Sequence, residues 1–362
     1  MARLAFIAAL LLISCGKDSK GAKDGNGKEA AIEKEQVQEE KQTQEEKEAK
    51  QILEDIKIGE LQYEEVIYTS TFNNIPGEIK SVVENIGSKT HRIAFQFQLG
   101  DGFSKTVSIT KDIPPASRIE LEIGRELNLA KEAFAIKNET KTTLQTSVYG
   151  LAGGKVLLIE RSNRIRLLPP QFFNWREPEY IAAFITYQMD SIPALQKEIA
   201  QKIGSIDAYQ RGSASRVEEH VKAAYEVIAE RKWHYIGGFA TNAGQKIRYP
   251  VEIMRERSAN CIEGALLFSA IIESLGVRTA IVLVNRPYGG HAYLAWKSDE
   301  RFEYFDKVIE TTLAFNDNPA SYEQAAMRGS DEFYGDKNAG YVTNIIDVKR
   351  MWNAGVSLNE VP

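Results

Sequence analysis

The chain has 362 residues, of which 43% are hydrophobic and 26% are charged, and its formal net charge is −5. This composition is typical of a globular protein and excludes disordered and fibrous classes, and the length suits two domains of ordinary size. A slightly acidic chain lacks the basic surface that nucleic acids require, so no nucleic-acid partner is expected. No apolar run reaches the roughly 18 residues that a membrane-spanning helix needs.

The first fifteen residues have the pattern of a secretory signal. Arg3 supplies a positive charge, and an uninterrupted apolar stretch follows from Leu4 to Ile13. The stretch leads to Leu12-Ile13-Ser14-Cys15, which resembles the bacterial lipobox, in which the cysteine receives a diacylglycerol and becomes the new N-terminus. The resemblance implies a lipoprotein signal peptide over residues 1–15 and lipidation of Cys15. The alternatives are a soluble secreted protein with an incidental cysteine and an ordinary signal peptide that is cleaved nearby.

A lipid on Cys15 would anchor the protein to a membrane of the bacterial cell envelope, on the periplasmic side or at the cell surface. The chain has only one other cysteine, Cys261, which then has no intramolecular partner and forms no disulfide despite export. An unpaired thiol in an exported protein is exposed to oxidation. It is retained either because it is buried and inert or because it reacts.

Residues 16–58 have the composition of a charged, flexible tether. Glu29 to Lys50 consists almost entirely of Glu, Gln, Lys and Ala, which cannot bury a core. Its charge spacing could support a solvated helix, and the segment is interpreted as a spacer between the membrane and the folded part.

From residue 59 to 168 the hydrophobic pattern has the period of two that is typical of β-strands. Two clear examples are His91 to Leu99 and Arg118 to Ile123. Shorter candidate strands lie at 61–71, 77–85, 104–110, 143–149 and 155–160. Short strands with this spacing predict an antiparallel, immunoglobulin-like β-sandwich, interpreted as a spacer or binding module.

Pro169-Pro170 marks a boundary, after which the period lengthens to that of helices. Glu179 to Ile203 and Ser215 to Arg231 are predicted helices, and residues 169–362 are assigned to a second domain that also contains strands. The fold class predicted for the whole chain is therefore α+β.

Asn260-Cys261-Ile262-Glu263 has the pattern of a helix start. Asn is a favoured N-cap, Glu263 completes a capping box, and Gly276 ends the apolar helical repeat that follows. Cys261 is thus expected at the first helical position. There the free N–H groups and the helix dipole favour a thiolate and can bind an oxyanion.

A predicted hairpin supplies two further polar groups. One strand begins at His291, and a second returns through a four-residue polar turn to Asp306. In the register that places Trp296 opposite Arg301, His291 stands opposite Asp306, with Cβ atoms about 4.5 to 5.5 Å apart. This separation suits an imidazole–carboxylate hydrogen bond, so Cys261, His291 and Asp306 have the pattern of nucleophile, base and orienting acid.

These motifs resemble the core of the transglutaminase-like superfamily over about residues 250–310. They are Asn260-Cys261-Ile262-Glu263-Gly264-Ala265-Leu266-Leu267, Leu275-Gly276-Val277, Gly290-His291-Ala292-Tyr293 and Tyr304-Phe305-Asp306. The resemblance implies a papain-like α+β domain with Cys261 as nucleophile, His291 as general base and acid, and Asp306 as orienting carboxylate.

The same resemblance implies a second oxyanion donor from an upstream side chain. The candidates, among which the sequence does not choose, are Gln245, Trp233 and Tyr235. The calcium sites of the animal enzymes have no counterpart here, and no metal or other cofactor is expected.

Two functions remain open. The first is an exported, lipid-anchored cysteine hydrolase or acyltransferase that acts on amide bonds through a thioester. It would be a protease, amidase or deamidase rather than a crosslinking transglutaminase, with peptides or proteins, including cell-wall peptides, as substrates. The second is a non-catalytic envelope lipoprotein in which the sandwich binds a partner and a degenerate transglutaminase-like core is a scaffold.

Overall fold

The structure is a computed structural model. It describes residues 44, 46–72, 79–152, 154–188, 190–204, 214–238, 240–241 and 244–359. Its mixture of helices and strands confirms the predicted α+β class. The predicted signal segment 1–15, with Cys15, and the tether up to residue 43 lie outside the described residues. Within the described part, no helix is both long enough and apolar enough to cross a membrane.

Two sheets share one core in the N-terminal half of the described chain (residues 46–168). The first contains β1 (Ile56–Ile58), β4 (Ile79–Asn85) and β2 (Gln62–Tyr63) in that order, and β7 (Ser117–Glu122) also pairs with β4. The second has the order β3 (Val66–Tyr68), β9 (Gly154–Leu168), β8 (Thr140–Ala152), β5 (His91–Leu99), β6 (Val107–Ile113). The alternating apolar side chains Phe95, Phe97 and Leu99 are buried, as the period of two predicts. Two short helical segments, η2 (Gly124–Glu126) and α2 (Lys131–Phe134), connect β7 to β8.

The predicted tether is expected to run to residue 58, but the fold begins earlier. Residues 46–55 form a helix, here called the N-terminal helix, that buries Ile52 and Asp55 against the sheets. A Cβ at Gly150 would lie 2.6 Å from Cγ2 of Ile52, so the helix docks closely on β8. Asp55 Oδ2 lies 2.7 Å from His91 Nε2 on β5. The predicted end of the tether at residue 58 is wrong. Ile52 and Asp55 make buried contacts with the sheets, and these contacts fix a helix that is otherwise rich in Glu and Lys.

The C-terminal half (residues 172–359) is built around α6 (Cys261–Ser274), which is buried along most of its length. An antiparallel sheet has the order β17 (Lys307–Ile309), β16 (Gly289–Trp296), β15 (Thr279–Arg286), β18 (Val342–Asp347). One set of its apolar side chains belongs to the core around α6, and another packs with Phe333 of α7 (Tyr322–Asn338). The other helices are η3 (Pro178–Phe184), α3 (Ser191–Ile203), α4 (Ala214–Ala229), α5 (Pro250–Glu256), η5 (Thr311–Ala314) and α8 (Val348–Asn353). Short strands complete it: β10 (Phe172–Phe173), β11 (His234–Tyr235), β12 (Ala240–Thr241), β13 (Gly244–Lys246) and β14 (Ser258–Ala259).

The predicted helix from Glu179 to Ile203 is two elements, η3 and α3. Pro193 accounts for the start of the second, because proline lacks an N–H donor and is tolerated only in the first turn of a helix. The predicted helix from Ser215 to Arg231 is α4, with bounds that differ by one or two residues.

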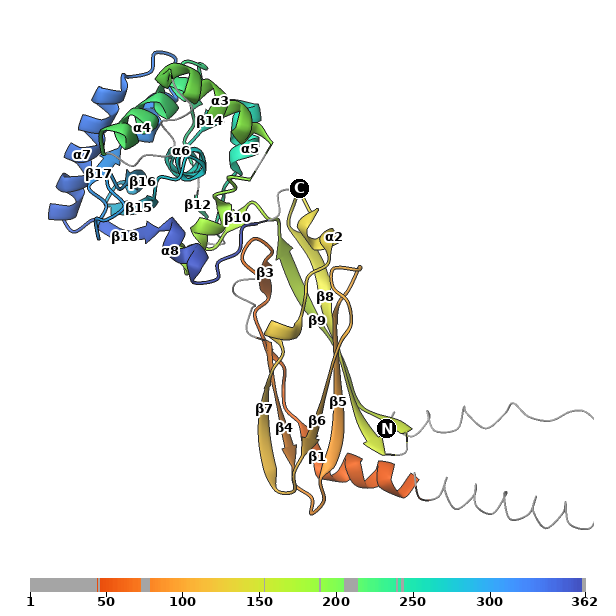
Figure 1. Cartoon of the computed structure of the whole chain (residues 1–362). Helices are drawn as coiled ribbons and strands as arrows, with labels where there is room; N and C mark the ends of the chain where they lie inside the picture. The colour runs from red at the N-terminus through yellow and green to blue at the C-terminus, as the bar shows by residue number, and fades with distance from the viewer. Residues whose placement is uncertain are drawn as a thin grey trace, which may run out of the picture.

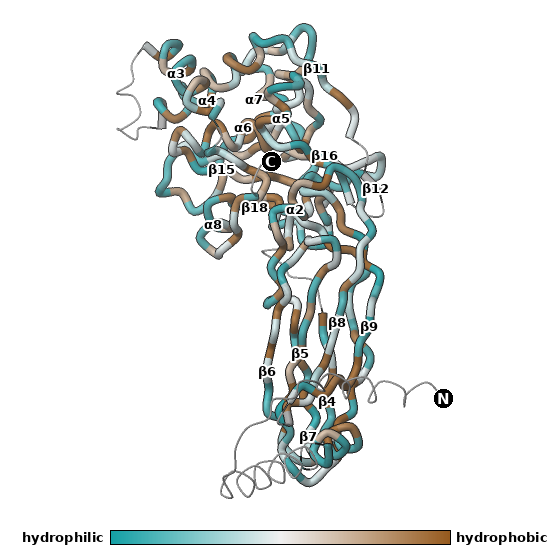
Figure 2. Tube along the Cα trace, turned by 90° about the vertical axis from the view of Figure 1, so that its right-hand side faces the viewer, coloured by the Kyte–Doolittle hydropathy of each residue, from teal (hydrophilic) through white to brown (hydrophobic). Residues whose placement is uncertain are grey.

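The two halves are stacked end to end (Figure 1). The N-terminal helix, orange in Figure 1, lies at the end of the β-strands that is far from α6. A perpendicular view shows the same arrangement, with the long strands running away from the helical part (Figure 2). At the junction, Thr69 Oγ1 donates to Leu168 O at 2.8 Å and Ser70 Oγ donates to Phe172 O at 2.6 Å. Cys261 therefore lies in the half that is remote from the N-terminal helix.

Candidate active site

Cys261 is the first residue of α6, as the sequence predicts. Glu263 N donates to Asn260 Oδ1 at 3.0 Å, and Asn260 N donates to the Glu263 carboxylate at 3.2 Å, so the predicted capping box is confirmed. The thiol is free and only partly buried. The first N–H groups of a helix have no intrahelical acceptor, so the sulfur lies beside donors that stabilise negative charge.

A buried ion pair that sequence reasoning missed holds this helix start. Arg248 donates to both carboxylate oxygens of Glu263, at 3.0 and 2.6 Å, and Glu263 is only 2% exposed. Arg248 also donates to Glu256 at 2.6 Å. Burial disfavours the charge, but hydrogen bonds to Glu263 and Glu256 outweigh it and raise the pKa of Arg248. A bidentate charged pair fixes geometry, so Arg248 positions the turn that carries Cys261.

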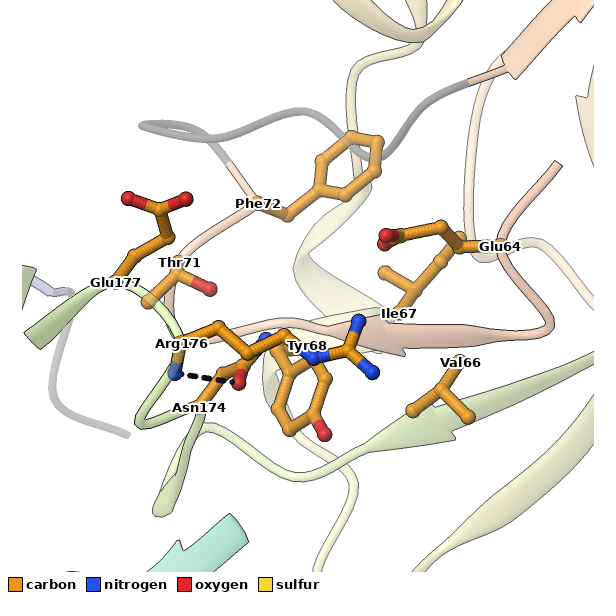
Figure 3. Close-up of a pocket in the computed structure, with 9 residues that line it drawn as sticks. All are labelled: Glu64, Val66, Ile67, Tyr68, Thr71, Phe72, Asn174, Arg176 and Glu177. Carbon is orange, nitrogen blue, oxygen red and sulfur yellow. Dashed lines mark hydrogen bonds between the residues drawn. The ribbon is translucent and has the colours of Figure 1, made fainter. Parts of the chain in front are cut away.

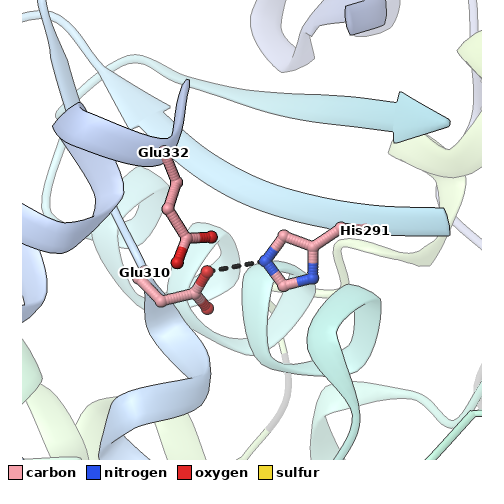
Figure 4. A group of neighbouring side chains, drawn as sticks. All are labelled: His291, Glu310 and Glu332. Atoms are coloured by element: carbon pink, nitrogen blue, oxygen red, sulfur yellow. Dashed lines mark hydrogen bonds and ion pairs between the residues drawn. The ribbon is translucent and has the colours of Figure 1, made fainter. Parts of the chain in front are cut away.

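The carboxylate that contacts His291 is Glu310. His291 Nε2 and Glu310 Oε2 are 2.6 Å apart (Figure 4). Glu310 is 4% exposed and follows the last residue of β17. Its other oxygen accepts hydrogen bonds from Thr312 N at 3.0 Å and Thr312 Oγ1 at 2.6 Å. The carboxylate is thus held in one orientation toward the ring.

Asp306, the predicted partner of His291, lies elsewhere, and that prediction is wrong. Trp296 pairs with Lys307, so the connection spans residues 297–306 instead of a four-residue turn. This register puts Asp306 beyond the end of β16, roughly 20 Å from His291 along the strand at about 3.4 Å per residue. Asp306 instead accepts hydrogen bonds from Ser298 N at 2.8 Å and Ser298 Oγ at 2.5 Å, which close the loop.

The ring of His291 lies between Glu310 and Cys261. Glu310 occupies Nε2, so Nδ1 is the ring nitrogen left for Cys261, whose side chain is close enough to act on the pKa of the ring. Burial lowers the pKa of His291, but the hydrogen bonds and negative charges of Cys261 and Glu310 outweigh it and raise that pKa to about 10. The imidazolium is therefore the favoured form at neutral pH. A cation next to a sulfur at a helix start is the environment of a reactive cysteine.

Tyr235, one of the upstream candidates for an oxyanion donor, lies beside the helix start. β11 pairs in parallel with β14, so Tyr235 is adjacent to Ala259, two residues before Cys261. Burial, and then the charges of Cys261 and Glu310, raise the pKa of Tyr235. The hydroxyl stays protonated over a wide pH range and can donate a hydrogen bond.

Gln245 is also close to the helix start, whereas Trp233 is not exposed to the site. A Cβ at Gly238 would lie 3.0 Å from Gln245 Nε2 and 3.0 Å from Asn260 Nδ2, so the two amides flank this glycine. Trp233 is fully buried and packs edge-on against Phe315 with ring centroids 5.4 Å apart. Its indole belongs to the core.

A cavity of about 500 Å³ opens beside the histidine–glutamate pair; its lining is His291, Glu310, Thr312, Leu313, Ala320, Gln324, Met327, Arg328 and Glu332. Among the described residues, His291, Glu310 and Glu332 place potential ligand atoms within 4.8 Å of one another (Figure 4). Imidazole and carboxylate are ligands that a divalent cation can use. However, Glu310 is bonded to His291, and Glu332 accepts from Arg286 at 3.0 Å. A metal ion there would have to displace the proton shared by His291 and Glu310 and the Arg286 guanidinium on Glu332. These bonds already satisfy the two carboxylates.

A smaller cavity of about 90 Å³ lies where the two halves meet (Figure 3). Its lining is Glu64, Val66, Ile67, Tyr68, Thr71, Phe72, Asn174, Arg176 and Glu177. Arg176 N donates to Asn174 Oδ1 at 3.0 Å within it. Ligand pockets usually measure about 300 to 1,000 Å³, so this cavity is too small to be a candidate active site.

A scan against protein-family models finds no match, and no curated protein matches the sequence. Among solved structures, the chain is similar to one described as Pseudomonas fluorescens alkylpurine DNA glycosylase AlkC bound to DNA containing an abasic site analog. The identity is 11%, the TM-score is 0.20, and the match covers 32% of this chain and 30% of that chain. That protein is bound to DNA, contrary to the expectation from net charge that this chain has no nucleic-acid partner, and this expectation is not maintained. A likeness this low carries no argument for DNA binding or for glycosylase chemistry.

Proposed function

We propose that the chain is an exported, lipid-anchored cysteine hydrolase or acyltransferase that acts on amide bonds. Cys261 is the nucleophile, His291 the acid and base, and Glu310 the orienting carboxylate. One observation carries this proposal: His291 bonds Glu310 at 2.6 Å, and its ring lies close enough to Cys261, at the start of α6, for that side chain to raise the pKa of the imidazole. Nucleophile, base and orienting acid recur in this order of contact in hydrolases of unrelated folds. An immunoglobulin-like N-terminal half and a transglutaminase-like C-terminal half belong to the same proposal.

In the first step the Cys261 thiolate attacks the carbonyl carbon of the amide, and a C–S bond forms. The carbonyl oxygen becomes an oxyanion, which the first N–H groups of α6 stabilise. Tyr235 or Gln245 supplies the second donor, since both lie beside the helix start.

In the second step the C–N bond breaks, and the proton on Nδ1 of His291 moves to the leaving nitrogen. The amine departs and leaves a thioester on Cys261. Water then attacks the thioester and gives a proton to the neutral ring of His291. The C–S bond breaks, a carboxylic acid leaves, and the thiolate and imidazolium are restored. An amine in place of water would form a new amide, and hydrolysis is the proposed outcome.

The anchoring part of the proposal is supported by the signal-like residues 1–15 and the lipobox-like Cys15. The N-terminal helix lies at the end of the N-terminal half that is far from α6 (Figure 1). A protein anchored through its N-terminus would then hold Cys261 away from the membrane, toward substrates of the envelope.

Alkylation of Cys261 by iodoacetamide tests the proposal without a known substrate. The rate is measured between about pH 5 and 9 for the wild type, for His291→Ala and for His234→Ala. His234 is a matched control, because its side chain is 68% exposed and pairs with Asp317. We expect His291→Ala to slow alkylation at least about tenfold near pH 6, and His234→Ala to leave it unchanged. Equal rates in all three proteins would overturn the proposal and favour the non-catalytic lipoprotein.

A further inference from the structure

A second carboxylate lies within reach of His291. Glu332 of α7 places an oxygen within 4.8 Å of the ligand atoms of His291 and Glu310 (Figure 4). The bond to the ring is made by Glu310 alone of these two acids. Since an imidazolium attracts both carboxylates, the surroundings must determine which of them pairs with it.

Arg286, the last residue of β15, forms an ion pair with Glu332. Its guanidinium donates to Glu332 Oε2 at 3.0 Å and to Asp336 Oδ2 at 2.7 Å. Its Nε donates to both Asp336 oxygens, at 2.9 and 3.1 Å. The side chain of Arg286 is 13% exposed and that of Asp336 is 9% exposed, so this ion pair is poorly screened by water.

Tyr293 joins the same network to the ring of His291. Its hydroxyl lies 2.7 Å from Asp336 Oδ2 and 3.1 Å from Glu332 Oε2, and it also contacts Arg286. Its ring packs edge-on against the imidazole, with centroids 4.7 Å apart. The network therefore holds both acids of α7 and one face of the histidine.

The charged groups around His291 come from α6, from the residue after β17 and from α7. Glu310 after β17 bonds the ring, and Cys261 of α6 lies close enough to raise its pKa. Asp336 of α7 acts on it through space, and Glu332 is further bonded by Arg328. Glu332 and Asp336 act on the ring without bonding it, and Glu332 is the one whose oxygen lies within 4.8 Å of the ligand atoms of His291 and Glu310.

We propose that Arg286 is a positioning residue that keeps Glu332 away from His291, so that Glu310 alone orients the ring toward Cys261. This inference rests on the proposed function. Without Arg286, the Glu332 carboxylate would turn to the imidazolium and draw Nε2 from Glu310. Nδ1 would then move away from the sulfur, and the pair of charges that activates Cys261 would be lost.

The test is the pH profile of Cys261 alkylation by iodoacetamide in the full protein, with thermal unfolding as a check on folding. We expect Arg286→Met to slow alkylation about tenfold near pH 6.5 and to move its profile toward that of His291→Ala. The double variant Arg286→Met with Glu332→Gln should return to within about twofold of the wild type, because the competing carboxylate is gone.

A purely structural role for Arg286 predicts a different result, since removing a second member of the network would not restore the rate. The inference fails if Arg286→Met alkylates like the wild type, or if the double variant is as slow as the single one. If Arg286→Met does not fold, Arg286→Lys with and without Glu332→Gln makes the same comparison, with an expected loss of about threefold that the second change reverses. If instead His291→Ala alkylates like the wild type, the proposed function itself fails.

Discussion

Each half of the molecule buries a histidine against a carboxylate, and the two pairs have nearly the same geometry. His91 Nε2 is 2.7 Å from Asp55 in the N-terminal half, and His291 Nε2 is 2.6 Å from Glu310 in the C-terminal half. Both pairs are formed by side chains that are mostly buried. Distance and burial therefore do not distinguish a structural pair from a chemical one.

The surroundings distinguish them. A Cβ at Gly87 would lie 2.1 Å from Cγ of Asp55, so backbone packs tightly against that carboxylate and the pair fastens the N-terminal helix. His291 instead has Cys261 close enough to raise its pKa, and it lines a cavity of about 500 Å³. A nearby thiol and an adjoining cavity, rather than the histidine–acid bond, distinguish this pair from the one in the N-terminal half.

The largest expected effect separates the two histidines. His291→Ala should lower amide hydrolysis by about 10³-fold, because it removes both the base and the proton donor. His91→Ala should keep full activity and lower the melting temperature instead. Turnover of a peptide substrate and thermal unfolding of both variants check this. Comparable activity losses in the two variants would break the comparison.

Glu310→Gln should lower activity by about 100-fold, since the ring keeps a partner but loses the charge that orients it. Glu310 and Cys261 together raise the pKa of His291 to about 10, against the lowering effect of burial. Without the Glu310 charge that pKa falls, and the alkaline limb of the pH–rate profile moves to lower pH. The profile measured from about pH 5 to 11 tests this. An unmoved alkaline limb would show that Glu310 does not set the protonation of the ring.

The two pairs should also fail at opposite ends of the pH scale. The pKa of Asp55 is lowered, chiefly by its bond to His91, so its stabilisation is present above its ordinary value and is lost as pH falls. The pKa of His291 is raised, so its stabilisation is complete below its ordinary value and is lost as pH rises toward about 10. Asp55→Asn should cost about 1 to 2 kcal/mol of unfolding free energy at pH 7. Denaturant unfolding at about pH 7 and pH 3 should show this cost shrinking in acid, and a constant cost would contradict the pairing.

The smallest expected effect is that of Asp306→Asn. Its carboxylate accepts from Ser298 N and Oγ, so the change should cost about 1 kcal/mol of stability. Activity should stay within about twofold of the wild type. The hydrolysis rates of Asp306→Asn and Glu310→Gln are measured in the same assay. A loss for Asp306→Asn as large as that for Glu310→Gln would restore the triad expected from the sequence.

Sequence patterns correctly predicted the elements that depend on bonds between residues close together in the chain. The capping box at Asn260 and Glu263 joins residues three apart, so it marks the start of α6 at Cys261 without knowledge of the rest of the chain. Gly276 has φ of +81°, the left-handed conformation expected for the residue that ends this helix. Alternation also located β5, whose bounds His91–Leu99 agree with the prediction.

The third member of the site was mispredicted because a loop imitates a strand. Residues 301–304 alternate polar and apolar side chains, but Phe302 and Tyr304 stack on each other with centroids 5.6 Å apart and remain exposed. The alternation therefore reflects packing within the loop. Glu310 could have been noticed only as an acid directly after the apolar end of β17, a weak signal by itself.

The amino-acid sequence by itself determined the α+β class, the helix that begins at Cys261 and the strand that begins beside His291, because each depends on residues close together in the chain. The tertiary structure decided which acid meets His291, which upstream donors lie near Cys261, and that the partly buried Arg248 and Arg286 form ion pairs. These contacts join side chains from separate elements, and a shift of the β16–β17 register exchanges one acid for another. Periodicity reports the face on which a side chain lies, whereas the partner it meets depends on loop length and on packing between distant segments.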